Sequence, residues 1–467
     1  MTLPLDFATL IGADHVLTGD AMAPYLTDWT GAYSGDALAV LRPGTPDEVA
    51  RVVAAAQVRR LPITPQSGNT SVSGGSVPGV RGGIVLSLAR LNQIRAIDTV
   101  ARTVTVDAGV VVQTLQEAVG AHGLDFPLMF GARGSALIGG TLATNAGGSN
   151  VLRYGNARDL CLGVEAVMAD GSMVHGLTGL HKDNSGYDLR HLLCGSEGTL
   201  GIITGAVLKL VPTPRVRSTA FLSLAGLEAA LEVLHAFQDA TGRLVEAFEW
   251  MPGEMVQAIL DHRPDLRAPL GHVAETHVLV ELASTRADDA AASEGQTRLD
   301  GVLLEVLEAQ MGAGRVLDGA VAASHRQRQD FWTLREAVLE TLAANDFQHI
   351  DASLPLSEVP GFIAEAGALV AKAGLRTLLV GHLGDGNIHY AVAARAREVP
   401  DFEGFFGRLT DLLLARRGSF SAEHGIGRSK AALLAARKDP GQMAAMQAVK
   451  RALDPEGLLN PGVLFEG

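Results

Sequence analysis

Two histidines flank a glycine-rich turn in VGHLGDGNIHYAV, residues 380–392. Apolar β-formers on both sides of Gly-Asp-Gly-Asn predict a β-hairpin. If Leu383 and Ile388 close this turn, His382 and His389 are directly opposed, with Cβ atoms about 4.5–5.5 Å apart. Two imidazoles placed in this way can share one metal ion at about 2.0–2.1 Å from each. The alternative is a pair of hydrogen-bonded core histidines.

A third metal ligand is available in SAEHGIG, residues 421–427, where Glu423 precedes His424. The glycines indicate a flexible loop, and we expect it to follow a strand. Two histidines and a carboxylate make a three-ligand site with an open position, which is the arrangement of catalytic zinc. Zn²⁺ fits these ligands best, with Mn²⁺, Fe²⁺ and Co²⁺ as alternatives. The dense turn and the second histidine-containing loop favour a metal site over two core histidines.

Two glycine-rich stretches could bind a phosphate group. PQSGNTSVSGG (65–75) and ALIGGTLATNAGGSNVLRYGNARD (136–159) offer many backbone N–H groups and few bulky side chains. Such loops can approach a pyrophosphate closely and donate several hydrogen bonds. A plain flexible turn is the alternative for the first stretch. Because neither GxGxxG nor GxxxxGK[ST] occurs, neither a Rossmann nor a P-loop nucleotide site is supported.

The bulk composition excludes several classes of protein. The 467 residues are enough for two or three domains, and 47% hydrophobic with 19% charged residues indicates a globular chain. No apolar run is long enough for a transmembrane helix, and the N-terminus lacks the features of a secretion signal. A net charge of −13 argues against nucleic acid as a partner. Cys161 and Cys194 are expected to be buried thiols of a cytoplasmic protein.

Hydrophobic periodicity gives a coarse order of elements. A strand ending at Leu41, a helix capped by Thr45 or Asp47 and a strand around Ile63 form a strand–helix–strand unit. Further strands are expected at 83–88 and 102–109, a helix at 111–123 and a hairpin at 164–174. Pro212 and Pro214 indicate a boundary. Beyond it, helices at 225–240, 285–312, 324–344 and 357–373 are expected to alternate with strands at 216–224, 273–283, 376–382 and 388–394.

These motifs together resemble a known family. Residues 65–75, 138–148, 153–155, 197–204 and 460–462 are similar to the FAD-binding domain of vanillyl-alcohol oxidase type flavoproteins. Residues 381–389 and 421–430 resemble the cap domain of the D-2-hydroxyacid dehydrogenase branch, which includes D-lactate, D-2-hydroxyglutarate and glycolate dehydrogenases. The resemblance implies an α+β fold with a two-subdomain FAD-binding domain at 1–215 (lead-in 1–35) and an α+β substrate domain at 216–415. A C-terminal helical segment, 416–467, would carry the catalytic loop and return to the FAD domain.

The resemblance also implies which residues contact FAD. The first glycine-rich loop would wrap the pyrophosphate, the second would line the flavin, Ile203 would contact the adenine end and Asn460 would reach the flavin. Some relatives attach FAD through a histidine in the first loop, and its absence here predicts non-covalent FAD. The implied FAD-contacting set is Pro65, Gln66, Ser67, Gly68, Asn69, Thr70, Ser71, Gly75, Ile138, Gly139, Gly140, Thr141, Thr144, Asn145, Gly147, Gly148, Tyr154, Glu197, Gly198, Gly201, Ile203 and Asn460.

The implied reaction is the oxidation of a D-2-hydroxy acid to a 2-oxo acid. The metal would lower the pKa of the substrate hydroxyl, His424 would take its proton, and the hydride would pass to flavin N5. Arg335 would bind the substrate carboxylate, although a solvent-facing arginine beside Glu336 is the alternative. His349 lies near a second family position that carries Lys or His.

The sequence leaves alternatives open for the substrate, the electron acceptor and the class of protein. D-2-hydroxyglutarate is the expected substrate, with D-lactate, malate, longer D-2-hydroxy acids and glycolate as alternatives. Leu339 and Ala391 stand where relatives carry polar residues, which weakens the case for a dicarboxylate. The missing NAD fingerprint favours a quinone or an electron-transfer flavoprotein as electron acceptor, and an oxidase that reduces O₂ is the alternative. A homodimer is a further expectation. A metal-dependent hydrolase, which would be colourless, and a non-catalytic binding module also stay open.

Overall fold

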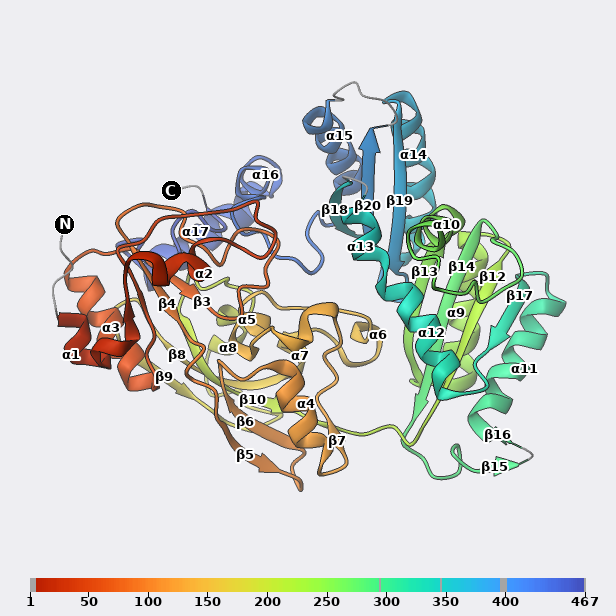
Figure 1. The fold of residues 1–467 in the computed structure, drawn as a ribbon, viewed down its shortest axis with the longest axis horizontal. Coiled ribbons are helices and arrows are strands. Elements are labelled where there is room, and N and C mark those ends of the chain that lie inside the picture. Colours follow the sequence, from red (N-terminus) through yellow and green to blue (C-terminus); the bar gives the residue numbers. More distant parts are fainter. Residues whose placement is uncertain (1–5, 294, 345–346, 395–400, 466–467) are drawn as a thin grey trace. The chain divides into compact units, whose positions relative to one another are not determined.

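The chain folds into two compact units. The computed structural model describes residues 6–293, 295–344, 347–394 and 401–465. Unit 1 combines Met1–Gly147, Gly155–Pro212 and Glu423–Gly467, and unit 2 combines Gly148–Tyr154 and Thr213–Ala422 (Figure 1). The chain therefore leaves unit 1 briefly at 148–154, and the boundary at the C-terminal side falls between the neighbouring residues Ala422 and Glu423.

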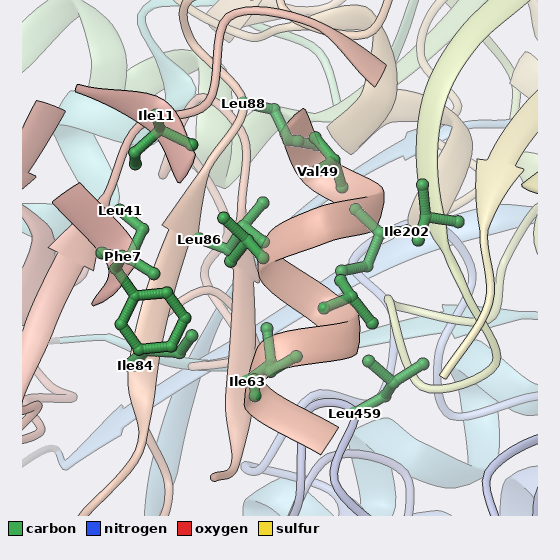
Figure 2. Packing of buried hydrophobic residues seen from close by; sticks show 14 of the residues in the cluster. Phe7, Ile11, Leu41, Val49, Ile63, Ile84, Leu86, Leu88, Ile202 and Leu459 are labelled. Carbon is green, nitrogen blue, oxygen red and sulfur yellow. The ribbon is translucent and has the colours of Figure 1, made fainter. Parts of the chain in front are cut away.

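A four-stranded sheet forms the N-terminal part of unit 1, in the order β1 (Val16–Leu17), β2 (Ala39–Leu41), β4 (Ile84–Ser87) and β3 (Ile63–Gln66). The strands β2, β4 and β3 are parallel, and α3 (Pro46–Val58) connects β2 to β3. The side chain of Thr45 accepts a hydrogen bond from Glu48 N–H and begins this helix. The predicted strand–helix–strand unit is thus confirmed. Figure 2 shows its core, to which Ile202 and Leu459 contribute from distant parts of the sequence.

A five-stranded antiparallel sheet completes the strand framework of unit 1. Its order is β5 (Ile94–Asp98), β6 (Thr103–Asp107), β10 (Ile202–Lys209), β8 (Cys161–Val167) and β9 (Met173–Gly176). Strands β7 (Leu124–Asp125) and β11 (Val211–Pro212) pair separately. The other helices are α1 (Asp6–Ile11), α2 (Ala23–Leu26), α4 (Val112–Gly120), α5 (Ile138–Ala143), α7 (Ala157–Leu160), α8 (Leu189–Leu193), α16 (Ala431–Arg437) and α17 (Pro440–Leu453), with 3-10 turns at Ala13–His15, Gly19–Met22 and Gly131–Gly134.

Unit 2 is built on a seven-stranded antiparallel sheet. Its order is β17 (Val316–Val321), β12 (Val216–Leu224), β14 (Thr276–Ser284), β13 (Val245–Pro252), β19 (Leu375–His382), β20 (Asn387–Ala394) and β18 (Gln348–Ser353). The helices α10 (Gly253–His262), α12 (His325–Glu336) and α13 (Val338–Ala343) pack on one face of it (Figure 1). The remaining elements are α6 (Val151–Tyr154), α9 (Leu227–Thr241), α11 (Arg298–Gly312), α14 (Val359–Lys372), α15 (Phe402–Ala415), a 3-10 turn at Leu356–Glu358 and the paired strands β15 (Ala292–Ser293) and β16 (Gln296–Thr297).

Sequence periodicity finds most of these elements and misplaces some. The expected strand at 216–224 is confirmed with its bounds, but the expected start of the helix at 285–312 is wrong. That helix begins at Arg298 because Thr297 and Asp300 form a reciprocal capping box there. Strands β13, β17 and β18 and helix α10 were not predicted. No helix among the described residues is long and apolar enough to cross a membrane.

Candidate functional site

The loop after β3 presents a row of main-chain donors. In the part of the chain that the structure describes, no N–H group from residue 68 to residue 72 donates to a protein acceptor. These residues are half-buried. A Cβ atom on Gly68 would lie 2.7 Å from the Ser135 carbonyl oxygen, so only glycine allows this close approach. Consecutive amide donors of this kind suit the oxygens of a diphosphate.

Side chains of the first loop hold its shape. The Asn69 amide donates to the Thr27 carbonyl at 2.8 Å, its Oδ1 accepts from the Ser76 hydroxyl at 2.7 Å, and its φ is +51°. The amide of Gln66 donates to two main-chain carbonyl groups, those of Tyr25 and Ser76. The Ser67 hydroxyl accepts from Gly140 N–H at 3.0 Å and so joins the first glycine-rich loop to α5.

The remaining residues of the expected FAD set lie in several environments. The hydroxyls of Thr141 and Thr144 donate to carbonyls within α5, and Asn145 Oδ1 accepts from Arg158 N–H. Ile138 and Ile203 are buried, and a Cβ on Gly139 would collide with Ala108. The Tyr154 hydroxyl donates to Glu246 in unit 2. Contacts with FAD stay a prediction for the whole set: Pro65, Gln66, Ser67, Gly68, Asn69, Thr70, Ser71, Gly75, Ile138, Gly139, Gly140, Thr141, Thr144, Asn145, Gly147, Gly148, Tyr154, Glu197, Gly198, Gly201, Ile203 and Asn460.

Strands β19 and β20 form the predicted hairpin, but its register differs from the expectation. His382 is opposite Asn387, and His389 is opposite Val380, so the two histidines are diagonal neighbours and not directly opposed. The turn contains Leu383–Gly386, and the closing pair is His382 with Asn387 instead of Leu383 with Ile388. The Asn387 N–H also bonds Asp385 Oδ1 in the turn. Both rings still lie on one face, with centroids 5.5 Å apart and planes at 82°.

Each histidine has a buried acid directly across from it on the neighbouring strand. Glu249 of β13 is opposite His382, and its Oε1 is 2.8 Å from His382 Nδ1. Asp351 of β18 is opposite His389, and its Oδ1 is 3.6 Å from His389 Nδ1. Both acids are 1% exposed. Such carboxylate–histidine pairs orient imidazoles that bind metals.

Glu249 also holds the arginine that the sequence singled out. Its Oε2 accepts from Arg335 Nε at 2.8 Å and lies 2.7 Å from Nη2. Burial alone would raise the pKa of Glu249, but the charges of His382 and Arg335 outweigh this effect and hold that pKa below its usual range. Arg335 is therefore not the surface arginine of the alternative interpretation, because its side chain is only 12% exposed.

The third expected metal ligand lies within reach of the two histidines. His382, His389 and Glu423 each offer one ligand atom, and these atoms all lie within 4.8 Å of one another. The neighbouring Ala422 N–H donates to the Asp351 main-chain oxygen at 3.2 Å and to Asp351 Oδ2 at 3.1 Å. The expected strand before Glu423 is wrong. Ser419 makes one antiparallel bridge and Ser421 one parallel bridge to β18, and two isolated bridges of opposite direction do not form a strand.

Three further residues singled out in the sequence lie in different environments. His424 accepts a hydrogen bond from the Ser73 hydroxyl through its main-chain oxygen. His349 is exposed and lies opposite Ala391, which is fully buried. Leu339 is 64% exposed.

Sequence reasoning missed Glu249, Asp351 and Asp385. Burial raises the pKa of Asp385 in the hairpin turn to about 6. The available signal for Glu249 was an acid inside VEAFEWMP, a strand whose residues from 245 to 251 are all buried. A buried carboxylate needs partners, so an acid inside such an apolar strand indicates a paired site.

Comparisons with known proteins identify two domains of the chain. Residues 37–176 match the family described as FAD binding domain, and residues 213–464 match FAD linked oxidases, C-terminal domain. The chain is 38% identical over 449 residues to the D-2-hydroxyglutarate dehydrogenase of Xanthomonas citri pv. viticola, covering 95% of this chain and 92% of the relative. It is 35% identical over 443 residues to the mitochondrial D-2-hydroxyglutarate dehydrogenase of Bos taurus, covering 95% and 79%.

Solved structures support the fold. A substrate-bound p-cresol methylhydroxylase aligns with a TM-score of 0.74 at 18% identity, covering 98% of this chain and 95% of that one. An alkyldihydroxyacetonephosphate synthase aligns with a TM-score of 0.72 at 16% identity, covering 98% and 85%. These likenesses confirm the expected α+β architecture of the vanillyl-alcohol oxidase type. From its sequence relatives and the two matched domains, the chain belongs to the FAD-linked oxidases and is a FAD-dependent dehydrogenase of the D-2-hydroxyacid branch.

Proposed function

We propose that this chain oxidises D-2-hydroxyglutarate to 2-oxoglutarate with FAD and a divalent metal ion. The observation that carries the proposal is the Glu249 carboxylate, which holds a histidine and an arginine side by side on one sheet face. A metal-binding imidazole next to a guanidinium suits a substrate with a hydroxyl group and a carboxylate. The choice of D-2-hydroxyglutarate follows the names of relatives 32–38% identical to the chain. D-Lactate, other D-2-hydroxy acids and glycolate are the alternatives.

In this proposal, unit 1 binds FAD. The unpaired amide row at 68–72 fits a diphosphate, and the glycines at 139 and 140 let α5 closely approach Ala108, and also Ser67 of the first glycine-rich loop. When bound, FAD supplies the acceptor for the hydride from the substrate Cα. We assign residues 1–215 and the returning segment 416–467 to cofactor binding, and residues 216–415 to substrate binding.

The metal would be held by His382, His389 and Glu423, with Zn²⁺ preferred and Mn²⁺ as an alternative. The donor set fits an ion: Glu249 occupies Nδ1 of His382, so Nε2 is the nitrogen directed to a metal. Such an ion would supply Lewis-acid polarisation of the substrate hydroxyl.

Three side chains would then act on the substrate itself. His424 would take the hydroxyl proton, since a neutral imidazole suits this role near pH 7. Arg335 would bind the carboxylate through Nη1, which has no protein acceptor among the described residues. His349 is the candidate for a second contact. A quinone or an electron-transfer flavoprotein as acceptor, a homodimer and a cytoplasmic location stay predictions.

An anaerobic visible spectrum tests the proposal. D- and L-2-hydroxy acids are added in turn, and we expect D-2-hydroxyglutarate to bleach the flavin band. EDTA should abolish the bleaching, and Zn²⁺ or Mn²⁺ should restore it. His424→Ala should stop turnover while FAD stays bound, and substantial remaining turnover would reject His424 as the base. A yellow protein that no hydroxy acid bleaches would refute the substrate class.

A further inference from the structure

The loop that contains His424 is held by a buried carboxylate from a distant part of unit 1. Glu197 precedes β10, and its Oε1 and Oε2 accept the N–H groups of Ile426 and Gly427, each at 2.8 Å. Glu197 is only 9% exposed, so these two bonds replace the water that burial removes. A Cβ on Gly425 would lie 2.9 Å from Glu197 Oε1, which shows how closely the loop approaches the acid.

The main chain of Glu197 is fixed as tightly as its side chain. Its N–H donates to the Ala143 carbonyl at the end of α5, at 2.8 Å, and its carbonyl accepts from the Asn460 amide, also at 2.8 Å. Its φ is +51°, a left-handed conformation that a non-glycine residue adopts only where its surroundings impose it. The carboxylate is therefore presented from a rigid position.

Ser73 holds the same loop from the other side. Its hydroxyl donates to the His424 carbonyl at 3.0 Å, and its own carbonyl accepts from Arg428 N–H at 2.9 Å and Ser429 N–H at 3.2 Å. Ser73 belongs to the first glycine-rich loop. The segment 424–429 is thus bonded to Glu197 through Ile426 and Gly427, and to Ser73 through His424, Arg428 and Ser429.

We propose that Glu197 is a positioning residue for the oxidation: it holds the His424 loop through the N–H groups of Ile426 and Gly427, and this role replaces the FAD contact predicted for it from the sequence. The inference rests on the proposed role of His424 as base. A base must lie within hydrogen-bond reach of the proton that it takes, and a small displacement of its loop slows the transfer strongly.

The variant Glu197→Gln tests the proposal. Glutamine keeps the shape but turns an NH₂ group toward one of the two N–H donors, so one bond is lost. We expect the rate constant of anaerobic flavin reduction to fall about ten- to a hundredfold, as when a supporting partner of a site residue is removed. FAD content and the substrate concentration for half-maximal rate should not change. Hydrogen exchange at 423–430 should become faster.

Glu165→Gln is the matched control. Glu165 is another buried acid of unit 1, on β8, bonded to Arg95 and to the Thr204 hydroxyl. It has no contact with the 423–430 loop, so this variant should leave flavin reduction and exchange in that loop unchanged.

The outcomes separate this inference from the proposed function. Wild-type rates in Glu197→Gln would overturn the inference while the function stands, and so would lost FAD with unchanged exchange at 423–430. If no hydroxy acid reduces the wild-type flavin, the function fails, and exchange alone decides whether Glu197 holds the loop. If Glu197→Gln does not fold, Ser73→Ala removes the bond to His424 from the opposite side. It should slow flavin reduction and speed exchange, and no change in either would overturn the inference.

Discussion

Replacing Glu249 with glutamine should weaken metal binding as well as folding. The carboxylate is 1% exposed and bonds His382 Nδ1, Arg335 Nε and Arg335 Nη2 at 2.7–2.8 Å. Glutamine keeps one acceptor oxygen and turns an NH₂ group toward either the imidazole or the guanidinium. One charged hydrogen bond is therefore lost in a buried site.

The magnitude follows from these contacts. Loss of one hydrogen bond to a charged group lowers the free energy of unfolding by about 1.5–3 kcal/mol. Loss of an acid that orients a metal-binding histidine lowers metal affinity by about ten- to a hundredfold. The folded-state pKa of Glu249 lies below its ordinary value of 4.5. Its contribution to stability is therefore present above pH 4.5 and is lost as the pH falls through the folded-state value.

Glu281→Gln is the control that separates the two effects. Glu281 is 2% exposed and lies on the same sheet face, where Arg328 of α12 donates to it through Nε and Nη2 at 2.6 Å each. No histidine contacts it among the described residues. Urea denaturation should show similar destabilisation in both variants, and calorimetric titration with Zn²⁺ should show weaker binding only in Glu249→Gln. Equal Zn²⁺ affinities in the two variants would refute the reasoning that Glu249 orients His382 for metal binding.

Three further predictions concern other parts of the chain. Because residues 65–75 contain no histidine, acid precipitation should release all FAD into the supernatant, and a coloured pellet would contradict non-covalent binding. Burial lowers the pKa of His277 from 6.5 to about 4, so unfolded chains alone take up this proton between those values. The free energy of unfolding should therefore fall by about 3 kcal/mol as the pH is lowered from 6.5 to about 4, at about 1.4 kcal/mol per pH unit. In urea denaturation, His277→Gln should show a shallower dependence of this free energy on pH. Gly386→Ala should cost at least about 1–2 kcal/mol in the same assay, since φ is +81° and the new Cβ would lie 2.1 Å from the Leu354 carbonyl oxygen.

Local sequence signals predicted the elements that local physics determines. Thr45 before Pro46 begins α3 because its hydroxyl bonds an orphan N–H, and this cap can be read directly from the residues. The Gly-Asp-Gly-Asn turn predicted the hairpin for the same kind of reason. Its register could not be read in this way: the turn begins one residue earlier, where the Asp385 side chain bonds the Asn387 N–H, so His382 pairs with Asn387 and not with His389.

The partners of the two histidines depend on the order of strands, which no local window contains. Glu249 reaches His382 only because β13 is next to β19, and Asp351 reaches His389 only because β18 is next to β20. In the observed registers, each histidine has an acid opposite it on the outer neighbouring strand and the other histidine diagonally across on the inner neighbouring strand. Glu249 lies 2.8 Å from Nδ1 of His382 and Asp351 lies 3.6 Å from Nδ1 of His389, so the proposed metal site would use the Nε2 atoms. The acid opposite each histidine is set by the β13–β19 and β18–β20 pairings, and the register between β19 and β20 sets only how the two histidines face each other.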